Sequence, residues 1–504
     1  MRGHISRRTV LGALASALGT AALADAPLTS LRPRARPSGA AAAATDIAPI
    51  PPEARATLEQ IVADARLEGT VSIAVADTSG RIIEGQAQDT ALPPASVTKS
   101  LTALYALETV GPEHRFVTRL IATGPVTDGR LDGDIALVGG GDPTLETDHL
   151  FSLAAELKAA GIREVTGRFL VYGGALPYED EIDEGQLDHL GYNPAVSGLN
   201  LNYNRVHFEW ARTGSSYRVT LDARSATYRP EVTIAEMRVA DRSLPVYTYA
   251  AAGDLDQWTV ARGALGDGGS RWLPVRRPAL YCGDVFRTFA RSHGIVLPAA
   301  EQVATEPTGS EVARHSSGRL QDVIRDMLRY STNLTAEVVG LTATASTGNT
   351  PPDIPTSAAA MNLWLEDRFG VEAGFVDHSG LGDASRISAA QMVGILTSPG
   401  VMERLMPVLK EHDLKDAEGA PIANYPATVH AKTGTLNFVS ALAGFIRTAE
   451  GADVAFAIFC GDLDAREAAK ASGDEIPAGS RYYNGRARNM QQRLLQRWGL
   501  IYTG

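Results

Sequence analysis

The sequence lacks the residues that mark metalloproteins and disulfide-stabilised domains. Only two of its 504 residues are cysteines, Cys282 and Cys460, so at most one disulfide can form. The motifs CxxC and HExxH are absent and the ten histidines are scattered, which gives a metal site no support. We expect no metal and no cofactor. The sequence leaves open whether the two thiols pair or stay as two unpaired buried thiols.

Basic residues and long hydrophobic runs are also scarce. The 47 Lys and Arg are outnumbered by 58 Asp and Glu, giving a net charge of −11, which argues against a nucleic-acid partner. After the leader, no segment approaches the ~18 consecutive apolar residues that a membrane span requires. Apolar residues at helical spacing in 488–500 predict a helix packed on a sheet, with a membrane-surface helix as the weaker alternative. We expect no transmembrane anchor and at most peripheral membrane contact.

The first 24 residues have the pattern of an export signal. The segment Ser6-Arg7-Arg8-Thr9-Val10-Leu11 opens a modestly apolar stretch, as in twin-arginine signals; an ordinary Sec signal or a basic tail is the alternative. Residues 25–50 are rich in Pro, Ala and Arg without an apolar period, which predicts a flexible linker. We therefore expect a periplasmic or otherwise extracytoplasmic protein, exported by a twin-arginine-like signal.

The chain is too long for one hydrophobic core, and we expect roughly two or three domains. Runs typical of β-strands lie near both ends of the chain and predict five antiparallel strands flanked by helices. Between them, residues 112–275 carry further β-prone runs broken by Gly, Asp and Pro. We predict an α+β fold, with one domain built from 51–111 and 276–504 and a large β-rich insertion at 112–275.

The first of three short motifs is Ser96-Val97-Thr98-Lys99, at the start of a predicted helix. Its spacing places Ser96 and Lys99 on one helix face. A serine hydroxyl becomes a good nucleophile when a base removes its proton, and Lys99 can be that base if a dry site and a nearby cation lower the pKa of its amine. Taken alone, Ser96 could equally be a helix cap and Lys99 a solvated residue of the first turn.

The second motif, Ser331-Thr332-Asn333, lies between two segments with helical periodicity. Ser331 could pass a proton to a leaving amine, and the amide of Asn333 can both donate to and accept from a peptide backbone. By itself such a tripeptide is more often a cap or a turn.

The third motif, Lys432-Thr433-Gly434, interrupts a β-run and is followed by Thr435. A lysine and two hydroxyls along a strand edge suit a carboxylate, and Gly434 lets a substrate approach the backbone. If the substrate lies antiparallel to this strand, the N–H groups of Thr435 and Ser96 can form an oxyanion hole. The alternative is an exposed edge lysine that prevents aggregation. The order of the three motifs favours catalysis over three separate structural roles.

On these motifs the chain resembles the penicillin-binding proteins and serine β-lactamases, and within them the D-alanyl-D-alanine carboxypeptidase/endopeptidase of the penicillin-binding protein 4 type. The likeness includes the long gap between Lys99 and Ser331, which matches a large insertion. It also includes four further segments: Val138-Gly139-Gly140-Gly141-Asp142-Pro143-Thr144-Leu145, Gly198-Leu199-Asn200-Leu201-Asn202, Asp377-His378-Ser379-Gly380-Leu381 and Leu442-Ala443-Gly444-Phe445-Ile446.

The resemblance implies a role for each motif residue. Ser96 would be the acylated nucleophile and Lys99 its base, and Ser331 and Asn333 would form the second side of the cleft. Lys432, Thr433 and Thr435 would bind the substrate carboxylate, with Gly434 among the substrate-binding residues. Asp142 matches a position that faces the cleft in similar proteins; an Asp-Pro turn is the alternative.

The leading hypothesis is a penicillin-binding, serine-type D-Ala-D-Ala carboxypeptidase/endopeptidase that cleaves peptidoglycan stem peptides through an acyl-enzyme. Its partners would be those stem peptides and β-lactams. The alternatives are a serine β-lactamase, which would hydrolyse its drug adduct quickly, and a non-catalytic peptidoglycan-binding module that keeps the fold alone.

Overall fold

The computed structural model describes residues 56–348 and 350–502. The export signal predicted at 1–24 and the linker predicted at 25–50 lie outside these residues. Within the described ranges, no helix combines the length and the apolar character that crossing a membrane would take.

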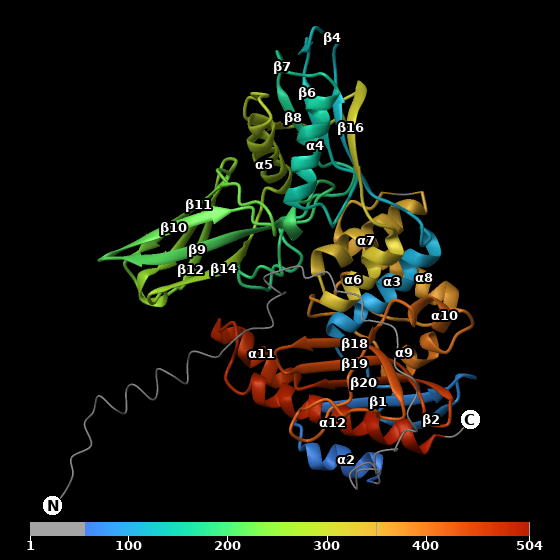
Figure 1. Cartoon of the computed structure of the whole chain (residues 1–504). Helices are drawn as coiled ribbons and strands as arrows, with labels where there is room; N and C mark the ends of the chain where they lie inside the picture. The colour runs from blue at the N-terminus through green and yellow to red at the C-terminus, as the bar shows by residue number, and fades with distance from the viewer. Residues whose placement is uncertain (1–55, 349, 503–504) are drawn as a thin grey trace, which may run out of the picture. The chain divides into compact units, whose positions relative to one another are not determined.

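The two ends of the chain together build one antiparallel sheet, as predicted (Figure 1). Five strands were expected, and the structure adds a sixth of two residues at the edge, too short to give a periodic signal. In spatial order the strands are β17 (Lys410–Glu411), β18 (Thr428–Leu436), β19 (Val439–Arg447), β20 (Asp453–Gly461), β1 (Thr70–Asp77) and β2 (Ile82–Gln86).

Successive residues of β1 face different cores, because side chains alternate across a strand. Ile73 and Val75 pack with Trp498 in the core beneath α2 (Leu58–Ala65) and α12 (Ser480–Ile501), which run along one face of the sheet (Figure 1). The helix predicted at 488–500 is therefore confirmed as one packed on the sheet.

Ala74 and Ala76 of β1 belong to the second core, on the other face. It is built from the sheet and from helical elements that include the helix after Ser96 and the helix that begins at Asn333. In chain order the helical elements of this part are η2 (Ala95–Val97), α3 (Thr98–Thr109), α6 (Leu320–Tyr330), α7 (Asn333–Ser346), α8 (Ile354–Phe369), α9 (Ala389–Leu396) and α10 (Val401–Leu405); α11 (Leu463–Ser472) follows β20.

The inserted region contains four small sheets. A five-stranded sheet has the order β15-β8-β6-β3-β16, and three-stranded sheets have the orders β10-β9-β14, β11-β13-β12 and β4-β5-β7. Their bounds are β3 (Val117–Ala122), β4 (Val126–Thr127), β5 (Arg130–Leu131), β6 (Ile135–Val138), β7 (Glu164–Val165), β8 (Phe169–Tyr172), β9 (Arg205–Thr213), β10 (Ser216–Asp222), β11 (Ala235–Ala240), β12 (Tyr247–Ala252), β13 (Leu255–Ala261), β14 (Gly268–Pro274), β15 (Ala300–Gln302) and β16 (Ser310–Ser316), with α4 (Thr147–Ala159), η3 (Asn202–Asn204), η4 (Arg262–Ala264) and α5 (Pro278–Ser292) between them.

The insertion continues past the predicted boundary at 275. The helix α5 was assigned to the catalytic part, but its Phe286 packs with Phe169 of β8 in the core of the inserted region. The strands β15 and β16 then complete the sheet of β3, β6 and β8. The catalytic part resumes at α6, near residue 320. An amphipathic pattern shows that a helix has a buried face, but not which core that face joins.

Candidate active site

The side chain of Lys99 lies at the centre of the three motifs. It is buried, with 0% of its surface exposed, at the start of α3 directly after the short helix that carries Ser96. Its Nζ is 3.0 Å from Ser96 Oγ, 2.7 Å from Asn333 Oδ1 and 2.7 Å from the carbonyl oxygen of Ser379. The nucleophile and base predicted from the first motif are therefore within hydrogen-bond distance.

The two carbonyl partners of Lys99 favour its role as a base. A neutral amine has two N–H groups and one lone pair. If the N–H groups donate to Asn333 and Ser379, the lone pair is left for the hydroxyl proton of Ser96. Burial lowers the pKa of Lys99 from 10.5 to about 8, although the negative charges of Asp377 and Glu337 oppose that shift. About a tenth of the Lys99 side chains are thus neutral at pH 7, far more than for a solvated lysine.

The buried carboxylates of Glu337 and Asp377 position the loop that contacts Lys99. Neither residue was predicted from the sequence to have a role in the site. Glu337 accepts hydrogen bonds from the backbone N–H groups of His378 and Ser379, at 3.0 and 2.9 Å. Asp377 accepts from the N–H groups of Gly380 and Gly382, at 2.7 and 2.5 Å. Burial raises the pKa of both carboxyl groups. The only sequence signal for Glu337 is its place four residues after Asn333, on the same side of α7.

Lys432 and Ser331 form the second polar pair of the site. Lys432 is 2% exposed, and its Nζ donates to Ser331 Oγ at 2.9 Å and to the carbonyl oxygen of Thr433 at 2.7 Å. Ser331 caps α6 in the left-handed conformation, φ 58° and ψ 39°, which turns the chain directly into α7. Burial, and then the charges of Lys99 and Lys410, lower the pKa of Lys432. A bound carboxylate would restore its charge.

Asn333 connects Lys99 to the inserted region. Its Oδ1 accepts from Lys99, and its Nδ2 donates to the carbonyl oxygen of Tyr192, at 2.9 Å. Tyr192 belongs to the inserted region, so the insertion supplies a hydrogen-bond partner to a catalytic-motif residue. Sequence spacing gave no indication of this contact.

The edge of β18 opposite β19 pairs with the two-residue strand β17 only at residues 430–431, and the part after residue 431 is available to a substrate. The carbonyl of Val429 accepts from the N–H of His412, at 2.7 Å, which places the backbone groups of odd-numbered residues on the outer edge. By this alternation the N–H and C=O of Thr433 and Thr435 face the same edge. Ser96 N lies in the first turn of η2, where a helix offers its N–H groups no partner. The N–H groups of Ser96 and Thr435 are thus available for an oxyanion.

Close packing requires a glycine at position 434, in addition to the substrate access predicted from the sequence. A Cβ on this residue would come within 2.6 Å of the carbonyl oxygen of Pro94 and 3.0 Å of Ser96 N. The strand therefore packs directly on the turn that carries Ser96, and this packing brings Ser96 N beside β18.

Asp142 lies apart from this hydrogen-bonded set. Its carboxylate accepts from the N–H and the hydroxyl of Thr144, at 2.8 and 2.7 Å, and lies 3.6 Å from His315 Nε2. The ring of His315 stacks on that of His149. Asp142 is 1% exposed and belongs to the loop after β6, where its backbone bridges to Leu199. These contacts match the turn alternative; they do not link Asp142 to the lysines of the site.

Known proteins are similar to this chain in both sequence and fold. The model of the D-Ala-D-Ala carboxypeptidase 3 (S13) family matches residues 54–478. The chain is 28% identical to a D-alanyl-D-alanine carboxypeptidase of Actinomadura sp. (strain R39), over 86% of this chain and 87% of that protein. It is 25% identical to D-alanyl-D-alanine carboxypeptidase DacB of Haemophilus influenzae, over 74% of this chain and 82% of that protein.

A solved structure agrees with this assignment at the level of the fold. Penicillin-binding protein 4 of Haemophilus influenzae superposes with a TM-score of 0.70 at 21% identity, covering 87% of this chain and 99% of that one. The resemblance to penicillin-binding proteins of type 4 is thereby confirmed. The chain belongs to the D-Ala-D-Ala carboxypeptidase 3 (S13) family.

Proposed function

We propose that this chain is a serine-type D-Ala-D-Ala carboxypeptidase and endopeptidase that is acylated at Ser96 and acts on peptidoglycan stem peptides outside the cytoplasmic membrane. One observation carries the proposal. The buried amine of Lys99 has two carbonyl acceptors and, 3.0 Å away, the Ser96 hydroxyl. This arrangement suits proton removal from Ser96 and serves no evident purpose in a protein that only binds peptidoglycan.

The reaction proceeds in two halves. Lys99 Nζ takes the proton of Ser96 Oγ while Oγ attacks the carbonyl carbon of the penultimate D-Ala. The N–H groups of Ser96 and Thr435 stabilise the resulting oxyanion. The C–N bond breaks as Ser331 gives a proton to the departing amine and takes up the one that Lys99 removed from Ser96, so Lys99 is neutral again and the acyl group remains as an ester on Ser96. Water then cleaves that ester and regenerates the serine.

The carboxylate next to the scissile bond selects the substrate. Lys432 lies beside Ser331, and the exposed residues Thr433 and Thr435 follow it along β18. A carboxylate bound there would keep Lys432 charged and hold the scissile bond against Ser96. A β-lactam carries a comparable carboxylate beside its reactive amide, so the same groups would bind it.

Mass spectrometry of the purified protein after incubation with penicillin tests this proposal. We expect one penicilloyl group per chain, on the peptide that contains Ser96, and none in Ser96→Ala. The matched control is Ser100→Ala, one turn further along α3, whose buried hydroxyl has no hydrogen-bond partner among the described residues. It should be labelled like the wild type.

The lifetime of the adduct and the peptide products complete the test. An adduct that persists, together with D-alanine release from a pentapeptide, agrees with the proposal. Rapid turnover of penicillin without D-alanine release would indicate a β-lactamase instead. A wild-type protein that binds peptidoglycan but forms neither adduct nor product would contradict the proposal.

A further inference from the structure

A basic recess lies beside the carboxylate-binding strand. It has a volume of about 180 Å³ and is lined by Ala431 and Thr433 of β18, by Arg329 near the end of α6, by Lys410 of β17 and by Lys415. Thr433 belongs both to this recess and to the proposed carboxylate site. The recess therefore adjoins the reaction site along the outer edge of β18.

The charge of the recess is unbalanced. Arg329, Lys410 and Lys415 are exposed, and none of them forms an ion pair within residues 56–348 and 350–502. Asp413 is the one acid in the lining. His412 also lines it, but burial lowers the pKa of this imidazole to about 4, so it is neutral at pH 7. Asp326 interacts electrostatically with Arg329 from outside the lining, but the three cations still exceed the nearby acids in number, so the recess has an excess of positive charge.

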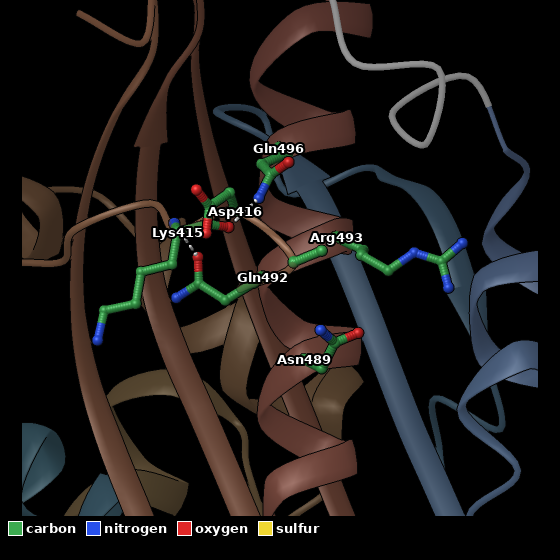
Figure 2. Close-up of a pocket in the computed structure, with 7 residues that line it drawn as sticks. Lys415, Asp416, Asn489, Gln492, Arg493 and Gln496 are labelled. Carbon is green, nitrogen blue, oxygen red and sulfur yellow. Dashed lines mark hydrogen bonds between the residues drawn. The ribbon is translucent and has the colours of Figure 1, made fainter. Parts of the chain in front are cut away.

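A second recess does not share this property. It has a volume of about 210 Å³ and lies between the Lys415–Ala417 loop and α12 (Figure 2). There Arg493 pairs with Asp64, and the backbone of Lys415 bonds to Gln492 and Gln496. Figure 2 shows the Lys415 side chain extending away from Arg493 and Gln496. The loop and α12 hold the Lys415 backbone in place, and its ammonium is directed elsewhere.

The direction of the substrate places the leaving group at the basic recess. A peptide antiparallel to β18, with its scissile carbonyl at Thr435 N, runs past Thr433 toward Ala431 after the scissile bond. Lys410 is the register partner of Ala431 on the same edge. Strand residues rise ~3.3 Å each, so Lys410 lies about 7 Å beyond the position of Thr433. A single leaving D-Ala ends at Thr433, whereas a longer leaving group reaches Lys410.

We propose that the recess binds carboxylates on the leaving side of a peptidoglycan cross-link and so favours endopeptidase over carboxypeptidase action. The inference rests on the proposed function and specifies its substrate. When a cross-link is cut, the leaving group is a second stem peptide, which has further carboxylates beyond the one next to the scissile bond. Arg329, Lys410 and Lys415 would pair with these groups; the single D-Ala of the carboxypeptidase reaction has none to offer them.

The test compares two reactions in the same protein preparations. The kcat/KM for cleaving a cross-linked muropeptide dimer is divided by the kcat/KM for releasing D-alanine from a monomeric pentapeptide. We expect Arg329→Gln combined with Lys410→Gln to lower this ratio about fivefold, the size expected for two exposed ion pairs. The matched control, Lys158→Gln, removes an exposed lysine from α4 and should leave the ratio unchanged.

A second arm keeps the protein constant and changes the substrate. Amidating the additional carboxylates of the leaving stem should lower wild-type cleavage of the dimer by a similar factor and should have little effect in the double variant. Added salt should weaken dimer cleavage more than D-alanine release, because ions screen exposed charges. This arm decides the question even if the double variant folds poorly.

The outcomes separate the two proposals. Normal penicillin acylation with an unchanged ratio, and no effect of amidation, would overturn the role of the recess and leave the proposed function standing. A wild-type protein without an adduct on Ser96 and without either product would overturn both.

Discussion

Three ionisable groups are buried together around the Ser96 hydroxyl, and their charges oppose the effect of burial. Burial favours the neutral form of Lys99, while Asp377 and Glu337 favour its charged form. The result, a pKa of about 8 for Lys99, is a compromise in which the base is partly neutral at physiological pH. The two carboxylates also hold the backbone at Ser379, whose carbonyl oxygen accepts from Lys99. Both carboxylates thus position the loop at Ser379 and affect the pKa of Lys99.

Replacing Asp377 by Asn tests this tuning. Below a pH of about 8 the wild-type Lys99 is increasingly protonated and a smaller fraction can accept a proton, so the rate constant for acylation should rise with pH through this value. Removing a negative charge lowers the pKa of Lys99, so in Asp377→Asn the rising limb should move to lower pH. The measurement is the second-order rate constant for penicillin acylation as a function of pH.

The control for this prediction is Asp464→Asn, an exposed acid in the first turn of α11, which should leave the limb in place. A limb that moves to higher pH, or a profile without a limb near 8 in the wild type, would contradict the assignment of Lys99 as the base.

At the scale of elements, the site depends on two glycines where chain segments pack on η2. Gly434 brings β18 against Pro94 and Ser96, and Gly380, with φ 74°, brings the loop after Asp377 against the carbonyl of Ala95. Ala95 itself has a positive φ of 47°. This conformation is unfavourable for alanine. It persists next to Ser96 because β18 and the loop at Gly380 pack closely against the turn.

A methyl group at Gly434 should therefore displace the nucleophile. In Gly434→Ala we expect the rate constant for penicillin acylation to fall about 100-fold, since a shift of ~1 Å at a reacting group has effects of this size. Overpacking should lower the free energy of unfolding by about 1–3 kcal/mol. Acylation kinetics and denaturant unfolding measure the two effects.

Gly485→Ala is the matched control. Gly485 lies within α12, and apart from the adjoining residues and the nearby backbone of that helix no atom lies within 4 Å of a Cβ added there. Alanine favours a helix by roughly 1 kcal/mol over glycine, so this variant should keep its activity and be slightly more stable. Loss of activity in both variants would show that the close packing at Gly434 is not the cause.

At the scale of the whole molecule, the structure separates the two cysteines. Both are free and buried; Cys282 lies in the core of the insertion and Cys460 in the core between the sheet and α12. Burial raises the pKa of both thiols, that of Cys460 to about 12. Neither has the exposure or the thiolate character that reactive cysteines require.

Redox conditions should therefore have no effect on this fold. We expect the same Tm with and without reductant, negligible alkylation of the native protein by iodoacetamide, and two alkylated cysteines per chain after unfolding. Thermal unfolding and intact-mass measurements check this. A drop in Tm upon reduction, or a mass that shows a disulfide, would contradict the structure.

Local information was enough to propose the central chemistry and to predict the main elements of the fold. The spacing of Ser96 and Lys99 is one helical turn, and the order of the motifs, together with strand and helix periodicity, was enough to predict the sheet, the two catalytic-motif helices and a large insertion. The roles of the motif residues could be inferred because the chemistry of serine acyl transfer needs a hydroxyl, an amine and a carboxylate-binding cation.

Tertiary packing alone decided the rest. Glu337 and Asp377 matter because the loop around Ser379 folds against α7, and Lys410 matters because a two-residue strand extends the edge of β18. Contacts between residues far apart in sequence also determine three further features. These are the core that α5 joins, the place of Asp142 beside His315 and the separation of the cysteines. A sequence period records which face of an element is buried; which partner buries it depends on the packing of the whole chain.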